Sequence, residues 1–288
     1  MKKILITLTI LIINLIITNP ANAIKIGLLT NVEEAGIGVN VNGRMIDVNT
    51  NKTVCTADAM RGYVIVPYKN AIAVKAGSQV YSLGTNAIVL RTDSYGYVST
   101  KGKWYHGKLM VKNVGGKLIV INDIDLESYL KGVVPSEMPA SWEFEALKAQ
   151  AIAARSFALA NLGKQAKYGY DLKDNTEDQA YGGASAETNI TNKAVDETHG
   201  LVLTYDMKII SAYYSASAGG MTSSSVWGGY APYLHSVPSF DDNVAKNGHG
   251  VGMSQHGANN LAKQGYNAYQ ILQYFYSNVK FAKLNKDT

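Results

Sequence analysis

From Ile24 to about Asp125, short apolar runs are separated by residues that favour turns, which is the pattern of an antiparallel β region. The runs are rich in β-branched residues and predict strands at 63–67, 71–75, 87–90, 104–112 and 117–121. The expected turns lie at Asn42-Gly43, Lys69-Asn70, Gly84 and Gly115-Gly116. No strong internal repeat is present, and this pattern carries no information about function.

From Leu126 onward the pattern changes to helix formers and loops. One or two helical turns are expected over 126–131, before Gly132. A long helix is expected over 144–162, where ALKAQAIAARSFALA consists almost entirely of strong helix formers, and it should stop at Gly163. Further segments predict a helix over 189–198, a hairpin from 202–205 and 209–214, and one or two helices within 258–278. The expected fold class is α+β, with a β-rich N-terminal region followed by a mixed α/β core.

The long helix carries several polar side chains of interest. Ser141 is a plausible N-cap, because Glu143 and Glu145 would then lie in the first turn, where the helix dipole favours acids. Lys148 and Arg155 are seven residues apart and share a face, whereas Gln150 points nearly the opposite way. For Lys148 and Arg155, the alternative to a functional role is that both side chains face solvent, as most helix charges do.

The first residues, MKKILITLTILIINLIITNPANA, have the three-part pattern of a secretory signal peptide. Two lysines precede an apolar run, and Ala21-Asn22-Ala23 is a typical cleavage site. A membrane anchor is the alternative, but the run from Ile4 to Thr18 is short for a bilayer. We expect residues 1–23 to be removed and the protein to be exported to a periplasm or cell-wall space.

Composition narrows the classes of function. The chain has 288 residues, of which 47% are hydrophobic and 17% charged, as in an ordinary globular protein. Without the two lysines of the leader its net charge is (27 − 2) − 22 = +3, which suits an anionic partner such as a cell wall but argues against nucleic-acid binding. Cys55 is the only cysteine, and the five histidines form no metal-binding spacing, so we expect no metal and no other cofactor.

One carboxylate stands out in GVVPSEMPASW, residues 132–142. Glu137 lies two residues after Pro135 and two before Pro139. A proline biases the residue before it toward an extended backbone, so both Val134 and Met138 are expected to be extended. A carboxylate held in this way suits acid–base catalysis, and its apolar neighbours could raise its pKa. The alternative is a turn before the long helix with a solvated glutamate, and these features alone leave the two readings open.

Six blocks of sequence resemble the SpoIID/LytB family and keep its order across about 100–280. They are YLKGVVPSEMPASWEFEALKAQAIAARSFAL, YDLKDNTEDQAYGG, the AV..T.G.VLTY stretch at 194–205, IISAYYSASAGG, VWGGYAPYLHSV and GHGVGMSQHGA. The resemblance implies a β-rich region over 24–99 and a catalytic domain over 100–288. It also implies an exported lytic transglycosylase that cleaves the MurNAc-GlcNAc β-1,4 bond of peptidoglycan and leaves 1,6-anhydro-MurNAc ends, with a preference for denuded strands. Some members are instead described as enhancers of cell-wall amidases, so a non-catalytic glycan-binding role is the alternative.

The resemblance also assigns residues. It implies that Glu137 is the catalytic acid and that Lys148, Gln150 and Arg155 bind substrate. A lone acid is sufficient for this reaction, because the C6 hydroxyl of the sugar is the nucleophile and one residue can donate and then accept the proton. A water-using glycosidase would need a second carboxylate, for which the nearest candidates are Asp123, Asp125 and Glu127. We expect these three to be structural.

The chain departs from the family pattern in two places. The cysteine and histidine positions of members that hold zinc read here as Lys173, Glu177, Asp178, Tyr214 and Ala218. We therefore expect no zinc. The connection between the PYLHSV and GHGVGMSQ blocks, which is often tens of residues long, is reduced here to 238–247. This puts the outer wall of the family's cleft in doubt.

The last candidates are binding residues. His249 and Gln255 belong to the glycine-dense GHGVGMSQHGA block and could hydrogen-bond a sugar; the alternative is a tight loop with buried, satisfied polar groups. Tyr181 and Tyr214 could stack on sugar faces, although such aromatic residues more often lie in a core. The predicted partners are peptidoglycan strands and a cell-wall amidase.

Overall fold

The computed structural model describes residues 23–226 and 229–284. These residues form five α-helices and twenty strands, which confirms the α+β class and the β-rich N-terminal region. Nearly all of the predicted leader lies outside the described residues. Among the described residues, no helix combines the length and the apolar character that crossing a membrane requires.

The described residues divide into two compact units. The strand-rich unit comprises residues 23–140 and 161–195, and the loop-rich unit comprises residues 141–160 and 196–284. The boundary expected at residues 99 and 100 falls inside strand β9 (Val98–Thr100) of the strand-rich unit. A catalytic domain over 100–288 stays a prediction.

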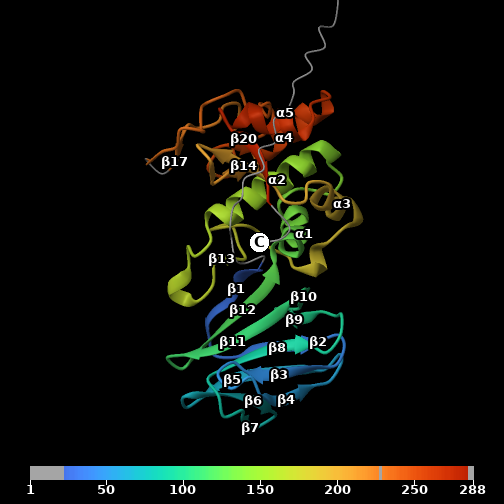
Figure 1. The fold of residues 1–288 in the computed structure, drawn as a ribbon, viewed down its shortest axis with the longest axis vertical. Helices are drawn as coiled ribbons and strands as arrows, with labels where there is room; N and C mark the ends of the chain where they lie inside the picture. The colour runs from blue at the N-terminus through green and yellow to red at the C-terminus, as the bar shows by residue number, and fades with distance from the viewer. Residues whose placement is uncertain (1–22, 227–228, 285–288) are drawn as a thin grey trace, which may run out of the picture. The chain divides into compact units, whose positions relative to one another are not determined.

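Two sheets make up most of the strand-rich unit (Figure 1). The larger has the order β13 (Leu172–Lys173), β1 (Ala23–Val32), β12 (Lys117–Asp125), β11 (Lys108–Val114), β8 (Ala87–Thr92), β3 (Gly43–Asp47) and β4 (Thr53–Ala57). The smaller has the order β10 (Lys103–Tyr105), β9, β2 (Ala35–Val39), β5 (Gly62–Tyr68), β6 (Ala71–Ala76) and β7 (Gln79–Ser82). Neighbouring strands are antiparallel except β1 and β13. Alternating apolar side chains such as Ile65, Ile72 and Val111 are fully buried.

The predicted strands are present, with two corrections. In the loop-rich unit, the strand expected over 209–214 ends at Ile209, and residues 214–215 pair elsewhere. The single strand expected over 104–112 is two strands, β10 and β11, which belong to different sheets. The chain turns at Gly107, whose φ of +76° favours glycine. A Cβ there would lie 2.3 Å from the carbonyl oxygen of Asp123, so the close approach to β12 also requires a glycine.

Helix α1 (Leu126–Glu137) is longer than expected. It begins at Asp125, whose side chain caps it by accepting a 2.9 Å hydrogen bond from the Ser128 N–H. It then continues through Gly132 and Pro135 instead of stopping before the glycine. A proline in the last turns removes one hydrogen bond, but burial of apolar residues such as Val133 outweighs that loss.

The two proline-based expectations therefore have different outcomes. Val134 is helical, so the prediction of an extended backbone there was wrong. Met138 has φ −128° and ψ 138°, as the following Pro139 requires, which confirms the prediction at this position. The helix ends at Glu137 because Met138 cannot continue it. After α1, this unit adds η1 (Ala166–Tyr168), η2 (Ala184–Ala186) and the start of α3 (Asn189–Glu197), which matches the predicted helix.

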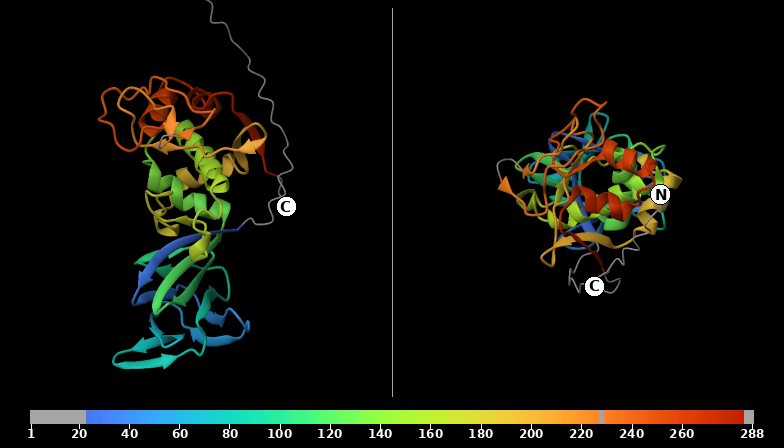
Figure 2. Two further views of the ribbon diagram at one scale, coloured as in Figure 1. Left: turned by 90° about the vertical axis from the view of Figure 1, so that its left-hand side faces the viewer. Right: turned by 90° about the horizontal axis from the view of Figure 1, so that it is seen from above.

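In the loop-rich unit, α2 (Phe144–Ala160) packs against β14 (Leu201–Tyr205), α4 (Gln255–Lys263) and α5 (Ala268–Phe275), as Figures 1 and 2 show. Strand β14 lies between β15 (Lys208–Ile209) and β20 (Lys280–Lys283). The remaining strands are two-residue pairs, namely β16 (Tyr214–Ser215) with β19 (Met253–Ser254) and β17 (Ser225–Val226) with β18 (Gly229–Tyr230).

The long helix begins later than its predicted cap requires. Because α2 starts at Phe144, the capping position is Glu143, and Ser141 lies too far upstream to act as the N-cap. The backbone N–H of Glu143 donates instead to the side chain of Asn259 at 2.9 Å, which anchors the start of α2 to α4. Helix α4 is capped by Ser254, whose hydroxyl accepts from the Gly257 N–H at 3.0 Å.

Candidate functional site

Glu137 is the last residue of α1 and is half-buried. Its Oε1 accepts a 2.7 Å hydrogen bond from the backbone N–H of Ala180. A second backbone bond lies one turn earlier, where the Gly182 N–H donates to the Gly132 carbonyl at 3.1 Å. The carboxylate predicted to be catalytic is therefore positioned from two sides, by the end of a helix and by the segment over residues 179–188.

Three glycines allow this segment to pass so close to α1. A Cβ on Gly132 would lie 2.6 Å from the ring of Tyr181, and one on Gly182 would lie 2.8 Å from Oγ of Ser136. Gly183 has φ +65°, and a Cβ there would lie 2.4 Å from the Trp104 carbonyl oxygen. The Tyr-Gly-Gly sequence thus sets the distance between the segment and the helix.

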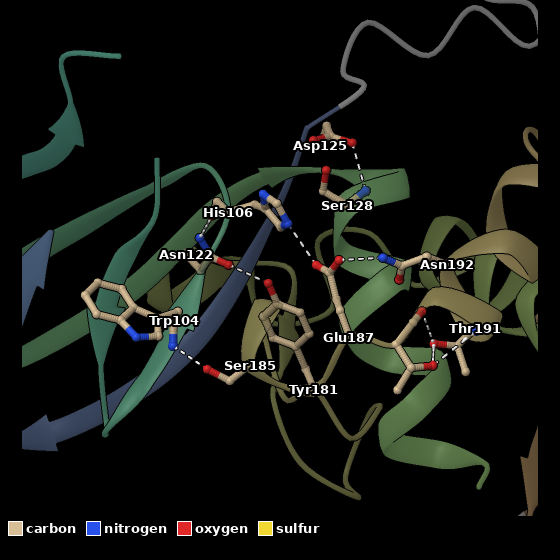
Figure 3. Close-up of polar contacts among 11 residues, drawn as sticks. Trp104, His106, Asn122, Asp125, Ser128, Tyr181, Ser185, Glu187, Thr191 and Asn192 are labelled. Carbon is tan, nitrogen blue, oxygen red and sulfur yellow. Dashed lines mark hydrogen bonds and ion pairs between the residues drawn. The ribbon is translucent and has the colours of Figure 1, made fainter. Parts of the chain in front are cut away.

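Tyr181 lies in the core of the strand-rich unit. Its side chain is 3% exposed, with ring centroids 5.7 Å from Tyr105 and 4.8 Å from Tyr129. Its hydroxyl donates to Oδ1 of Asn122 at 2.8 Å (Figure 3). The ring offers no exposed face for a sugar, so the alternative that it belongs to the core describes it better than the stacking role.

The three acids considered as second carboxylates lie at the other end of α1. Asp125 caps the helix, Asp123 pairs with Lys108 at 3.3 Å, and Glu127 occupies the first turn. A rise of 1.5 Å per residue separates Asp125 from Glu137 by about 18 Å. Glycosidases that use two carboxylates hold them roughly 5–10 Å apart. Asp125 thus lies too far away to act as the partner of Glu137 in such a reaction.

The loop over residues 173–178, where the family resemblance raised the question of zinc, is held by ion pairs. Lys173 pairs with Glu177, and Lys164 pairs with the buried Asp178. Asp178 also accepts a 2.8 Å hydrogen bond from the backbone N–H of Lys173. Two cations thus occupy this loop, and no three His, Cys, Asp or Glu side chains gather as metal ligands within the described residues. The residues present do not fit a zinc ion.

In the loop-rich unit, α2 carries three predicted binding residues. Arg155 is fully buried, and its Nη1 donates to the Leu201 carbonyl at 3.1 Å, so the solvent-facing alternative is wrong for this residue. Lys148 pairs with Glu145 at 2.5 Å and lies 3.8 Å from Glu197.

Gln150 and Gln255 come together although 105 residues separate them in sequence. The Nε2 group of Gln255 donates to Oε1 of Gln150 at 3.3 Å. Gln150 is fully buried, and its own Nε2 has no hydrogen-bond partner in the described structure. A buried donor without a partner is uncommon, and it is a feature that calls for a functional explanation.

His249 and Tyr214 lie near each other in the same unit. Nδ1 of His249 accepts a 2.9 Å hydrogen bond from the Val251 N–H, and its ring also bonds to the backbone of Tyr214. Burial lowers the pKa of His249, so the imidazole is neutral at pH 7. Tyr214 belongs to β16, and its ring lies 6.5 Å from that of Phe157. Both residues are integrated into the fold of this unit.

Sequence reasoning missed Asp241, which lies in the short 238–247 connection and is 2% exposed. Its carboxylate accepts from the N–H groups of Ala218 at 2.7 Å and Gly220 at 2.9 Å, from Ser254 at 2.5 Å, and from Ser239. Burial raises its pKa, but these four donors outweigh burial and hold the pKa below its usual value. No local pattern distinguishes it from the exposed Asp242 beside it.

Comparison with known proteins agrees with the resemblance noted above. Residues 114–205 match the family model SpoIID, described as Stage II sporulation protein. The chain is 38% identical to Stage II sporulation protein D of Bacillus subtilis over 136 residues, which are 41% of this chain and 40% of that protein.

Two further relatives are similar to the chain. It is 50% identical to the Amidase enhancer of Bacillus subtilis over 107 residues, which are 36% of this chain and 14% of that protein. It is 34% identical to an uncharacterised protein of Brachyspira hyodysenteriae over 213 residues, which are 73% of this chain and 56% of that protein. The matches thus span about half or less of each relative's length. The region that matches the SpoIID model, residues 114–205, includes Glu137, α2 and the 179–188 segment, and this part of the chain is similar to a SpoIID domain.

Proposed function

We propose that this protein is an exported peptidoglycan lytic transglycosylase that cleaves the MurNAc-GlcNAc β-1,4 bond. The observation that carries the proposal is the placement of Glu137 at the end of α1, with its Oε1 held by the Ala180 N–H, inside a SpoIID domain. Two features support the reading further: the leader pattern of residues 1–23 and the mildly positive charge after its removal.

The proposed reaction uses one side chain twice. Protonated Glu137 donates its proton to the glycosidic oxygen as the bond to the anomeric carbon breaks. The C6 hydroxyl of the same MurNAc then attacks that carbon and gives its proton to the Glu137 carboxylate. The product is a 1,6-anhydro end, and Glu137 returns to its protonated state. No water and no second carboxylate take part, which agrees with the distance of about 18 Å between the two ends of α1.

The binding residues predicted on α2 belong to the loop-rich unit, and we consider their chemistry within that unit alone. The buried Nε2 of Gln150 lacks a partner, and an amide or hydroxyl oxygen of the glycan would satisfy it. Lys148 carries a positive charge that suits the lactyl carboxylate of a denuded MurNAc, whereas Arg155 is fully buried and donates to the Leu201 carbonyl. His249 and Gln255 hold the glycine-dense loop through their hydrogen bonds.

The test is incubation of the purified protein with glycan strands, with and without stem peptides, followed by mass analysis. Anhydro-muramic ends are expected from the wild type, and Glu137→Gln should lower the rate by about a thousandfold or more, because it removes the proton donor. The matched control is Glu127→Gln, at the other end of the same helix, which should keep the wild-type rate. Reducing ends would indicate hydrolysis by water, and full activity of Glu137→Gln would exclude our assignment.

A second function is favoured by one observation, the 50% identity to the protein named Amidase enhancer. In that case the chain would bind glycan without cleaving it and would stimulate a cell-wall amidase. Such a protein would yield no products from glycan alone, would accelerate an added amidase, and would tolerate Glu137→Gln. The same assay therefore separates the two proposals.

A further inference from the structure

The 179–188 segment is tied to the sheets of the strand-rich unit at three places along its length (Figure 3). Near its start, the Tyr181 hydroxyl donates to Oδ1 of Asn122 on β12. In its middle, Oγ of Ser185 accepts a 2.8 Å bond from the Trp104 N–H on β10. Ala180, whose N–H donates to Glu137, immediately precedes Tyr181 in the chain.

The third tie is the pair of His106 and Glu187. Nε2 of His106 lies 2.8 Å from Oε1 of Glu187, and the two side chains are 17% and 16% exposed. Figure 3 shows Glu187 between His106 and Asn192, whose Nδ2 donates to the other carboxylate oxygen at 2.7 Å. One acidic side chain thus joins the β10–β11 turn, the end of the segment and the start of α3.

The charge on Glu187 is maintained by its surroundings. Burial raises the pKa of Glu187, but hydrogen bonds from His106 and Asn192 and electrostatic interactions with His106 and Lys131 outweigh burial and hold the pKa below its usual value. At neutral pH the carboxylate therefore accepts both bonds. Such charge-assisted bonds between partly buried groups are stronger than neutral ones.

The reaction proposed above requires Glu137 to stay within a few tenths of an ångström of a productive position. One of its two supports, the Ala180 N–H, belongs to the 179–188 segment, which has little regular structure of its own beyond the three residues of η2. The position of that N–H therefore depends on what fixes the segment. Gly182 allows close contact with α1 and Gly183 with β10, but both leave the backbone free to adopt many conformations when these contacts are lost.

We propose that His106 and Glu187 are positioning residues, which fix the 179–188 segment to the sheet and thereby hold the Ala180 N–H against Glu137. This inference rests on the proposed function of Glu137 but adds two residues that contact neither Glu137 nor the proposed scissile bond. It gives the turn between β10 and β11 a part in catalysis, which the sequence pattern there did not indicate.

The experiment compares wild type, Glu187→Gln, His106→Ala and His106→Gln for cleavage of glycan strands, with kcat and KM measured separately. Glu187→Gln and His106→Ala should lower kcat about tenfold and change KM less than about twofold, because the catalytic group is displaced while the binding residues stay. His106→Gln should restore most of kcat, because its amide nitrogen replaces the Nε2 donor. The matched control is Arg44→Gln, which breaks an ion pair with Asp93 at 2.6 Å on the same large sheet and should change nothing.

A second readout is hydrogen exchange at the Ala180 amide, which does not depend on activity. The Ala180 N–H should exchange about fivefold faster or more in Glu187→Gln and in His106→Ala than in wild type, and the Arg44→Gln rate should match wild type. If the first two variants fold poorly, Ser185→Ala provides a milder test at an exposed residue. It removes the acceptor of the Trp104 N–H and should also accelerate exchange of the Ala180 N–H.

The two readouts separate the two proposals. If the wild type does not cleave glycan, the proposed function fails, and faster exchange at Ala180 in the variants still supports the positioning role. If the wild type cleaves and Glu187→Gln keeps both its kcat and the protection of Ala180, the positioning role is overturned. It is also overturned if His106→Gln is as impaired as His106→Ala, since the lost donor would then not explain the effect.

Discussion

The two sheets of the strand-rich unit and the loops over 211–257 in the loop-rich unit satisfy their backbone polar groups in different ways. Strands β11 and β12 pair along an uninterrupted register from Lys108 opposite Asp123 to Val114 opposite Lys117. The loops have only two-residue pairs and isolated bridges, such as the one between Ser217 and Asn247. In their place, the side chain of Asp241 accepts two backbone N–H groups.

This difference determines how much stability is lost when a single side chain is changed. In a ladder each backbone donor meets a backbone acceptor, so a change of side chain leaves the hydrogen bonds in place. In the loops one carboxylate serves two segments and the N-cap residue of α4, so its removal leaves several buried donors without partners. Substitutions should therefore lower the stability strongly at a few positions in the loops, and only weakly at many positions in the sheets.

The largest effect is expected for Asp241→Ala. It leaves the N–H groups of Ala218 and Gly220 and the hydroxyl of Ser254 without their acceptor, and we expect a loss of about 3 kcal/mol or more in the free energy of unfolding. Chemical denaturation measures this loss. Asp242→Ala is the control, because Asp242 is exposed, and it should cost less than about 0.5 kcal/mol. Equal effects of the two substitutions would remove the contrast between loops and sheets.

A smaller effect on the free energy of unfolding is expected when the pH is lowered. The folded pKa of Asp241 lies below its unfolded value, so its contribution to stability is present above the unfolded pKa and is lost as pH falls through the folded pKa. The free energy of unfolding should therefore decrease below about pH 4, and Asp241→Asn should be less dependent on pH in that range. Denaturation series between pH 3 and 7 measure both. A variant with the same acid slope as the wild type would show that Asp241 is not the group responsible.

A still smaller effect on stability is expected for Tyr181→Phe in the strand-rich unit. The substitution keeps the ring in place but removes the hydroxyl that donates to Oδ1 of the fully buried Asn122. We expect a loss of about 1–2 kcal/mol, because one buried acceptor loses its partner while the ladders remain. Thermal and chemical unfolding measure it. A loss as large as that of Asp241→Ala would mean that side-chain bonds matter as much in the sheets as in the loops.

The smallest effect is expected for Lys75→Gln on β6. Lys75 pairs with Glu34 at 3.2 Å, and both side chains are about half exposed. Solvent-exposed pairs contribute little, so the free energy of unfolding should change by no more than about 0.5 kcal/mol. Salt titration provides the check, since any contribution of this pair should vanish at high ionic strength. A loss above 1 kcal/mol would contradict the tolerance expected of the sheets.

The fold could be predicted from sequence wherever a local energy decides it. The strands at 63–67 and 71–75 and the long alanine-rich helix follow from periodicity and propensity, and Met138 is extended because Pro139 follows it. Glu137 could likewise be selected as the candidate acid from its own neighbours and from the ordered blocks around it. These features depend on residues close together in the chain, so the sequence shows them directly.

Only the tertiary structure decided the features that depend on distant residues. Helix α1 continues through Pro135 because its apolar face is buried against the sheet, which outweighs the lost hydrogen bond. Tyr181 became a core residue, and Gln150 met Gln255 from 105 positions away. Asp241 acquired its importance from donors in two other loops. Burial and long-range pairing are properties of the folded chain, and the energies that they contribute leave no pattern in any single stretch of sequence.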